Sequence, residues 1–322
     1  MSVKVSIGIV GLGLMGRSIA TCILASGHKV TALTNEMPRA DEARGQILQY
    51  LEQMNAEGLL KQDPKKLIGN LTIADDFAAV GGHEIVLESI TEDVREKKAV
   101  YARLEAVVAP TAIIGSNTSS IPVTQLQSDM KHPERLLGIH WAEPAHVTRF
   151  IEIICGEKTD IRYANVIVQL SETWGKEPSL VKKDIRGFIT NRLMYAMMRE
   201  GFHLVENGYA TIEDIDRACR NDLGYWITFA GPFRFMDLTG IPAYLTVMEE
   251  LFPELSNSRA APRFVRDVVS SGAKGVSNER GFYSYTPESA AAWERLFMEF
   301  TYEIRKLAEK YPHNVGDIGE KK

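Results

Sequence analysis

The sequence predicts an α/β protein in which a parallel sheet, covered by helices on both faces, is followed by an all-helical region. Up to residue 183, short apolar runs typical of buried strands alternate with longer stretches of helical spacing. After residue 184 the strand-like runs stop. The chain of 322 residues has the length of two ordinary domains, and we place them at 1–184 and 185–322.

The first elements lie around a glycine-rich segment. KVSIGIVG, residues 4–11, is a β-branched run that ends in glycine and predicts the first strand. Residues 14–27 then have helical spacing and stop at Gly27. HKVTALT, residues 28–34, is a second strand, and a long helical tract follows over residues 39–60.

The remaining strands are predicted from further short apolar runs, namely EIVLESI (84–90), TAIIGSN (111–117), LLGIHWA (136–142), TRFIEIIC (148–155) and EPSLVKK (177–183). Helices are expected between them over residues 93–108 and about 160–175. From residue 185 on, long helical stretches cover 187–208 and 211–224, and Thr211 with acids in the next turn is a helix-start signal. The second domain is therefore expected to be all-α.

Composition disfavours several classes of protein. The formal net charge is -5 and the basic residues are scattered, which argues against a nucleic-acid partner. The apolar N-terminus is interrupted by Gly11, Gly13, Gly16 and Arg17, so we expect neither a signal peptide nor a membrane span.

The three cysteines, Cys22, Cys155 and Cys219, have no spacing that indicates a disulfide framework or a metal site. We therefore expect no metal and a reducing compartment, the cytoplasm.

A glycine-rich loop joins the first strand to the first helix. It has the pattern G-x-G-x-x-G and consists of Gly11, Leu12, Gly13, Leu14, Met15 and Gly16. In this context the first glycine permits a tight turn, the second lets the backbone approach a pyrophosphate, and the third lets helix and strand pack closely. The helix N-terminus adds free N–H groups and a partial positive charge. The motif predicts a dinucleotide cofactor in a Rossmann-type domain.

The end of the second strand bears on which cofactor is bound. Thr34 and Asn35 stand where an acid for the adenosine ribose of NAD is expected, and Glu36 follows. A missing acid removes repulsion against a 2′-phosphate, so NADP remains an alternative. However, the nearest arginine is Arg39. We favour NAD.

His140 ends an apolar strand, where active-site loops collect in α/β sheets. Hydride transfer from an alcohol needs a base for the hydroxyl proton, and histidine suits this near neutral pH; the alternative is a core histidine satisfied by the backbone. Two acids lie near it in sequence. Glu143 precedes Pro144, which places it at a loop mouth. Glu152 lies among aliphatic residues and needs a buried partner, so it is favoured as the partner of His140.

The segment GSNTSS follows a buried strand and contains Asn117, Thr118, Ser119 and Ser120. These side chains are either turn residues and a helix cap, or they present polar groups to a cofactor or substrate.

Taken in order, GLGLMG, SNTSS, His140 with Pro144 and IEII, and RGFITNRLM resemble the 3-hydroxyacyl-CoA dehydrogenase family, and GPFRFMDLTG and ERGFYSY agree with it. The resemblance spans residues 5 to about 285. It implies a Rossmann-type domain followed by an all-α dimerisation domain similar to the C-terminal domain of 6-phosphogluconate dehydrogenase. It also implies a homodimer and a place in fatty acid metabolism.

The resemblance assigns roles to individual residues. Ser119 matches the catalytic serine, His140 the catalytic histidine and Glu152 the acid that orients it. Asn191 matches the substrate-contacting asparagine. By the same resemblance Glu92 and Lys97 correspond to cofactor-contacting residues, and we count Asn117, Thr34 and Asn35 with them as cofactor contacts.

The resemblance also implies a reaction. It is hydride transfer between a nicotinamide cofactor and a 3-hydroxyacyl-CoA or related 3-hydroxy acid. Two departures concern the substrate: Glu143 stands where relatives have asparagine, and the lysine expected before GFY is missing. Glu143 is therefore a candidate substrate residue. The alternative substrate is a small non-CoA molecule, such as a sugar acid, a carnitine-like molecule or a hydroxymethyl-heteroaromatic acid. A more remote alternative is a non-catalytic NAD(H)-binding protein.

Overall fold

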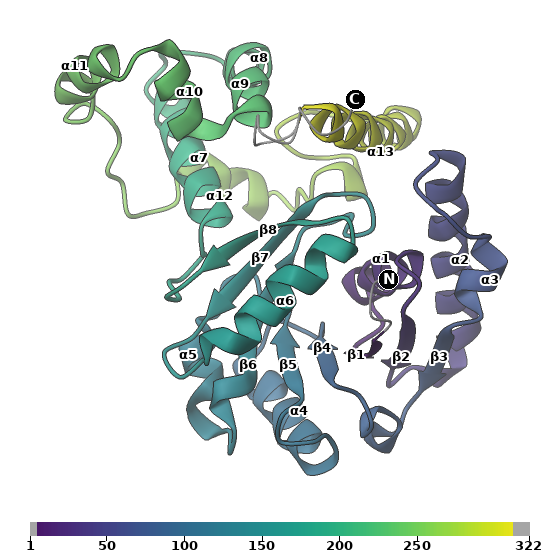
Figure 1. Cartoon of the computed structure of the whole chain (residues 1–322). Helices are drawn as coiled ribbons and strands as arrows, with labels where there is room; N and C mark the ends of the chain where they lie inside the picture. Colours follow the sequence, from purple (N-terminus) through teal and green to yellow (C-terminus); the bar gives the residue numbers. More distant parts are fainter. Residues whose placement is uncertain (1–4, 312–322) are drawn as a thin grey trace, which may run out of the picture. The chain divides into compact units, whose positions relative to one another are not determined.

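The computed structural model describes residues 5–311 and forms two compact units that divide after Asn191 (Figure 1). The first unit carries one eight-stranded sheet in the order β3-β2-β1-β4-β5-β6-β7-β8. The strands are β1 (Ser6–Val10), β2 (Lys29–Leu33), β3 (Leu71–Ala74), β4 (Ile85–Glu88), β5 (Ile113–Ser116), β6 (Leu136–Trp141), β7 (Phe150–Cys155) and β8 (Glu177–Val181). The first residue of the predicted 4–11 strand, Lys4, lies outside the described residues.

Helices cover both faces of this sheet, because its strands are apolar on both sides. The helices of the unit are α1 (Leu14–Ala25), α2 (Ala40–Ala56), α3 (Pro64–Ile68), α4 (Val94–Val107), α5 (Val123–Leu126) and α6 (Ile161–Thr173). On one face Ile7 and Ile9 of β1 pack in a core cluster with residues of α1, α2, α3 and α6. On the other face Val10 and Val86 belong to a cluster with α4 and α5. The predicted doubly covered sheet is confirmed.

The strand order defines where a ligand is expected. β1 pairs in parallel with both β2 and β4, so the chain winds outward through β3 and then returns to the other side of β1. The carboxyl ends of β1 and β4 therefore face a crevice at which the winding direction changes, and ligands of such sheets bind there. The glycine-rich loop follows β1, and the segment with Glu92 follows β4.

One strand pairing breaks the parallel pattern that the sequence analysis expected throughout, so β7 and β8 run opposite to the other six strands. β7 runs antiparallel to β6, because residues 142–149 alone connect them and a parallel crossover needs a dozen or more residues. In the resulting register His140 lies directly opposite Glu152. The sheet is therefore mostly, not wholly, parallel.

The sequence analysis also missed β3. Leu71–Ala74 is a short strand at the edge of the sheet, and only its first residue is buried. A four-residue, half-exposed run has too weak an apolar pattern to be distinguished from a loop. By contrast, the expected 39–60 helix is present as α2, which ends four residues earlier at Ala56.

The second unit is helical, as the sequence predicts for this region. Its elements are α7 (Thr190–Glu206, whose first two residues belong to the first unit), α8 (Ile212–Ala218), α9 (Gly224–Phe229), α10 (Gly231–Thr239), α11 (Ile241–Leu251), α12 (Arg263–Ser270) and α13 (Pro287–Lys310). Thr211 caps α8 by accepting a hydrogen bond from the Asp214 amide. A π-helical turn, Cys219–Leu223, separates α8 from α9. Over residues 5–311, no helix is long and apolar enough to cross a membrane.

Candidate active site

The three glycines of the loop after β1 have different surroundings. Gly11 has a φ of 98°, and a side chain there would collide with the Ser89 carbonyl. A side chain at buried Gly16 would collide with the Gly11 carbonyl. Gly13 is exposed, and an added Cβ would meet nothing within 4 Å. Gly11 and Gly16 are therefore required by the fold, whereas Gly13 is free to accommodate a ligand.

The start of α1 suits an anion. Gly13 is its N-cap, no side chain among the described residues caps it, and its first turn holds no acid. The helix N–H groups and their partial positive charge therefore remain available to a phosphate. Leu12 is buried, Met15 is partly buried and Leu14 is 63% exposed, so Leu14 is the most exposed of the three side chains.

The end of β2 has no acid, in agreement with the sequence. The Thr34 amide bonds the Ala74 carbonyl, its hydroxyl accepts the Glu36 amide, and Asn35 is exposed. Arg39 is held by two acids: its guanidinium lies 3.1 Å from Glu36 and makes two hydrogen bonds of 2.9 Å to Glu42. The nearest arginine is thus already paired with carboxylates.

His140 and Glu152 form a buried pair at the carboxyl end of β6. His140 Nδ1 lies 2.8 Å from Glu152 Oε2, and the two residues are 8% and 0% exposed. A carboxylate accepts at this distance, so Nδ1 carries the proton and Nε2 presents a lone pair. Phe150 and Phe188 flank the imidazole with ring centroids 5.4 and 5.8 Å away.

The second oxygen of Glu152 is also fully engaged. Oε1 accepts hydrogen bonds from the backbone amides of Ile189 (3.1 Å) and Thr190 (2.9 Å) and from the Thr190 hydroxyl (3.2 Å). Burial opposes ionisation, but the hydrogen bonds from His140 and these amides outweigh it, so the pKa of Glu152 lies below its ordinary value. Glu152 is therefore a charged acceptor that fixes the imidazole.

Ser119, in the loop after β5, lies beside Asn191 at the start of α7. Asn191 Nδ2 donates to the Ser119 carbonyl at 2.8 Å, and the Ser119 side chain is exposed. Asn117 acts as a brace between strand ends, because its side chain donates to Ser89 Oγ (3.2 Å) and accepts the Trp141 amide (3.0 Å). Both polar groups of Asn117 thus have protein partners.

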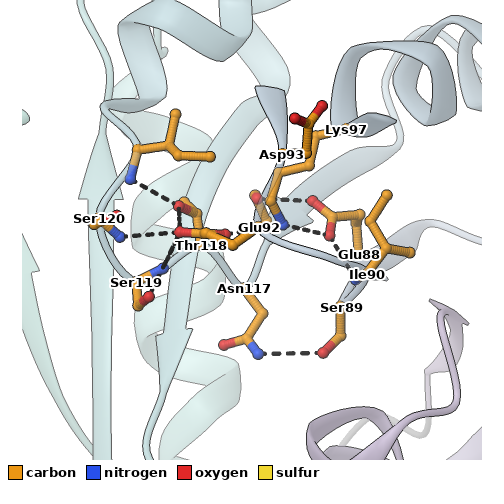
Figure 2. A network of polar contacts seen from close by, with 12 residues as sticks. Glu88, Ser89, Ile90, Glu92, Asp93, Lys97, Asn117, Thr118, Ser119 and Ser120 are labelled. Carbon is orange, nitrogen blue, oxygen red and sulfur yellow. Dashed lines mark hydrogen bonds and ion pairs between the residues drawn. The ribbon is translucent and has the colours of Figure 1, made fainter. Parts of the chain in front are cut away.

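Glu92 and Lys97 take part in a network that begins at the end of β4 (Figure 2). Lys97 is fully buried, and its Nζ lies 2.7 Å from Glu88 and 3.3 Å from Glu92. Glu92, whose side chain is 36% exposed, accepts hydrogen bonds from the loop that contains Ser119. Lys97 therefore faces two carboxylates rather than solvent.

Among the described residues, no hydrogen bond or ion pair joins Glu143 to His140. It is exposed, and a cis peptide joins it to Pro144. Desolvation of its carboxyl group by nearby chain raises the pKa of Glu143, against hydrogen bonds with Ser18 and Ala145 that lower it.

Sequence reasoning missed the partners that surround Glu143. Tyr50 of α2 stacks on His146, with ring centroids 4.3 Å apart, and His146 Nδ1 lies 2.8 Å from Ser18 Oγ of α1. Desolvation and the nearby Glu143 raise the pKa of Tyr50. No local pattern predicts this cluster, since α1 and the 142–149 loop are distant in sequence. Among the described residues there is no cluster of His, Cys, Asp and Glu arranged for a metal ion.

Two family models match almost the whole described chain. Residues 6–185 match the NAD binding domain of 3-hydroxyacyl-CoA dehydrogenase, and residues 187–285 match its C-terminal domain. The chain belongs to the 3-hydroxyacyl-CoA dehydrogenase family. The resemblance predicted from the motifs is thereby confirmed, as are the fold class and NAD as the cofactor. The protein is an NAD-dependent oxidoreductase of this type.

Individual relatives act on different substrates. The 5-formyl-3-hydroxy-2-methylpyridine 4-carboxylate 5-dehydrogenase of Mesorhizobium japonicum is 32% identical over 94% of this chain and 98% of its own length. A solved structure of a dehydrogenase of that name superposes with a TM-score of 0.89, covering 96% of this chain and 100% of that one at 32% identity. An L-carnitine dehydrogenase of Oceanobacillus iheyensis is 30% identical (95% and 98% covered), and a 3-hydroxybutyryl-CoA dehydrogenase of Mycobacterium tuberculosis is 29% identical (87% and 98%).

Substitution of single glycines will separate fold from cofactor binding. Gly13→Ala adds a methyl group in open space, so we expect an unchanged melting temperature but NAD affinity weakened about 10-fold, because the backbone can no longer approach the pyrophosphate. Gly16→Ala collides with backbone and will lower the melting temperature by several degrees, as overpacking costs about 1–3 kcal/mol. Fluorescence titration with NAD and thermal denaturation check both. Wild-type NAD affinity in Gly13→Ala would contradict the assignment.

The Glu152 network predicts a pH-dependent contribution to stability. Because the folded-state pKa is lowered, the charged group stabilises the fold above the unfolded-state pKa near 4.5, and this is lost as the pH falls below 4.5 through the folded-state pKa. The difference in melting temperature between wild type and Glu152→Gln should therefore be constant above about pH 5.5 and shrink below 4.5. Exposed Glu172→Gln is the control and should show no such change. A gap that persists undiminished into strong acid would refute the prediction.

Proposed function

We propose that this protein transfers a hydride between NAD and the hydroxyl-bearing carbon of a 3-hydroxyacyl-CoA or a related 3-hydroxy acid. The observation that carries the proposal is the buried His140–Glu152 hydrogen bond of 2.8 Å at the carboxyl end of β6. A histidine held in one tautomer by a charged carboxylate is suited to take a proton from an alcohol at neutral pH. The family membership supplies the reaction type.

In this mechanism His140 Nε2 accepts the hydroxyl proton while the carbon gives up its hydride. The imidazolium that forms is stabilised by Glu152, whose other oxygen is already held by the Ile189 and Thr190 amides. That arrangement means no solvent or side-chain rearrangement is needed when charge develops. Bound NAD supplies the hydride acceptor. In the reverse direction the imidazolium returns the proton to the carbonyl oxygen.

The neighbouring residues take binding roles in the proposal. Ser119 and Asn191, bonded to each other, hold the substrate oxygen. The loop with Gly13 and the start of α1 hold the pyrophosphate, and Thr34 and Asn35 lie toward the adenosine ribose. Glu92 and Asn117 border the nicotinamide end of the cofactor. Because Lys97 is fully buried, we assign it to holding Glu92 rather than to direct cofactor contact.

A second candidate is a small substrate without CoA, and Glu143 favours it. This exposed carboxylate lies in the loop that leaves β6 just after His140, and it is held near Tyr50 and Ser18. A negative charge there attracts a cation or a hydrogen-bond donor and repels a carboxylate. The pyridine carboxylate and L-carnitine dehydrogenases align with more of this chain than the 3-hydroxybutyryl-CoA dehydrogenase does.

The larger organisation of the protein is part of the same proposal. Residues 1–184 form the cofactor-binding domain, and residues 185–322 form the substrate and dimerisation domain of a homodimer. Large apolar side chains of the second unit support the dimer, since Phe233, Trp293 and Phe300 are 83%, 56% and 62% exposed in the single chain. The three cysteines are all unpaired, which is consistent with a cytoplasmic enzyme. A CoA substrate would place it in fatty acid metabolism.

His140→Ala should lower turnover by about 10²–10⁴-fold with the fold intact, because the general base is lost. The control is His132→Ala, which removes a half-exposed histidine paired with Glu134. The measurement is the steady-state rate of NADH oxidation with acetoacetyl-CoA, and of NADH formation with 3-hydroxy acids, sugar acids, carnitine and hydroxymethyl-pyridine acids. Turnover near the wild-type level in His140→Ala would end the proposed mechanism.

Glu143→Asn distinguishes the two substrate classes. If Glu143 binds a positive or hydrogen-bond-donating group, kcat/KM should fall about 10-fold for cationic substrates, and acyl-CoA substrates should gain or be unaffected. Glu172→Asn, at an exposed site on α6, is the control. An equal loss for every substrate in the panel would show that Glu143 does not select among them.

A further inference from the structure

Glu88 is a fully buried carboxylate that the proposed reaction does not use. It ends β4, and both of its oxygens are saturated with hydrogen bonds. Oε1 accepts from Lys97 Nζ (2.7 Å) and the Ile90 amide (2.8 Å), and Oε2 accepts from the Tyr101 and Ser116 hydroxyls (2.8 Å each). These donors come from α4, from the end of β5 and from the loop after β4. Glu88 therefore joins three elements at the carboxyl edge of the sheet.

Lys97 connects the buried Glu88 to Glu92, whose side chain is partly exposed. Its ammonium has no exposed surface and lies between Glu88 and Glu92, so it is a cation shared by two acids. Lys97 and Tyr101 are one helical turn apart on α4 and both face Glu88. A lysine fixed in this way has one position available, which sets where Glu92 is held.

Glu92 in turn holds the loop that contains Ser119. Its Oε1 accepts hydrogen bonds from the Thr118 hydroxyl (2.7 Å) and from the Ser119 and Ser120 amides (3.0 and 3.2 Å). Thr118 Oγ1 also accepts the Ile121 amide at 3.0 Å. Figure 2 shows the chain of contacts from Glu88 through Lys97 and Glu92 to this loop.

Stability alone gives a weak reason for this arrangement. Replacing a buried ion pair with apolar side chains of similar volume is often neutral or stabilising, because taking charges out of water is costly. The charged set lies at the carboxyl ends of β4 and β5, where a ligand of this sheet is expected, and its outer end is the partly exposed Glu92. The position of the network at this edge indicates that it fixes the geometry of the loop that contains Ser119 rather than raising the stability of the fold.

We propose that Glu88 is a positioning residue for Ser119, acting through Lys97 and Glu92 to fix the 118–121 loop. The proposal rests on the role assigned above to Ser119. Without the Glu88 charge, Lys97 has only Glu92 as its acidic partner and draws it inward, away from the Ser119 and Ser120 amides. A displacement of about 1 Å at a substrate-holding group is enough to reduce turnover by orders of magnitude.

The test compares Glu88→Gln with Glu105→Gln. Glu105 of α4 is a matched control, because it is also a carboxylate with a buried side chain and faces a buried cation, Arg135, at 3.6 Å. It accepts hydrogen bonds from the Lys131 and His132 amides instead of bonding Lys97. We expect kcat to fall on the order of 10- to 100-fold in Glu88→Gln, with the KM for NAD changed less than about threefold. Glu105→Gln should keep wild-type kcat even where its melting temperature falls equally.

Amide hydrogen exchange of the full-length protein gives a readout that needs no substrate. The 118–121 segment should exchange faster in Glu88→Gln than in wild type and remain protected in Glu105→Gln. Unchanged exchange in Glu88→Gln would overturn the proposal whatever the activity. Faster exchange together with full activity in Ser119→Ala would instead reject the role of Ser119, so the two failures can be told apart.

A double-mutant cycle tests whether Glu88 acts through Lys97. Lys97→Met should lower kcat to a similar degree, and adding Glu88→Gln to it should lower kcat less than twofold further, because residues in one chain of contacts are not additive. Fully additive losses would contradict the proposal. If Glu88→Gln does not fold, Lys97→Met and Tyr101→Phe replace it: the first should release the loop, and the second, which leaves Lys97 in place, should not.

Discussion

A carboxylate that is removed from water must be given hydrogen bonds or a cation, and two such carboxylates organise the working edge of this protein. Glu88 ends β4 and Glu152 lies within β7, and each uses both oxygens. Their donors come from segments far apart in the sequence. The need to satisfy these charges therefore fixes the loops after β4 and β5 and the segment before α7 in one arrangement.

The antiparallel pairing of β6 with β7 has a chemical consequence. In a strand pair, residues directly opposite each other have their Cβ atoms about 5 Å apart, which suits a histidine–carboxylate hydrogen bond. A register shift by one residue would turn Glu152 to the other face of the sheet and leave His140 without its acid. The short 142–149 connection, which allows only antiparallel pairing, also carries Glu143. Thus a single hairpin-like unit contributes both the His140–Glu152 pair and the carboxylate proposed for selectivity.

Sequence reasoning predicted those features that depend on local pattern. The glycine-rich loop, most strands and the partnership of His140 with Glu152 follow from apolar runs and from the cost of an unpaired buried acid. The same reasoning applied to Glu88 in EIVLESI was within reach, since it too is an acid at the end of an aliphatic run. Its hydrogen bond with Ser116 was not, because Ser116 is distant in sequence and meets Glu88 only once β4 and β5 pair. The stacking of Tyr50 on His146 and the edge strand β3 likewise depend on tertiary structure.

The pairing of Arg39 with Glu36 and Glu42 has a consequence for redesign of the cofactor preference. Its guanidinium is neutralised by Glu36 and by a two-fold contact with Glu42, close to the end of β2 where the adenosine ribose of a dinucleotide is expected. The cation that a 2′-phosphate requires is therefore already encoded, but it is occupied. Replacing Glu36 and Glu42 with neutral residues would free the Arg39 guanidinium to bind a 2′-phosphate. A change of cofactor preference from NAD to NADP therefore requires the removal of two carboxylates rather than the construction of a new binding site.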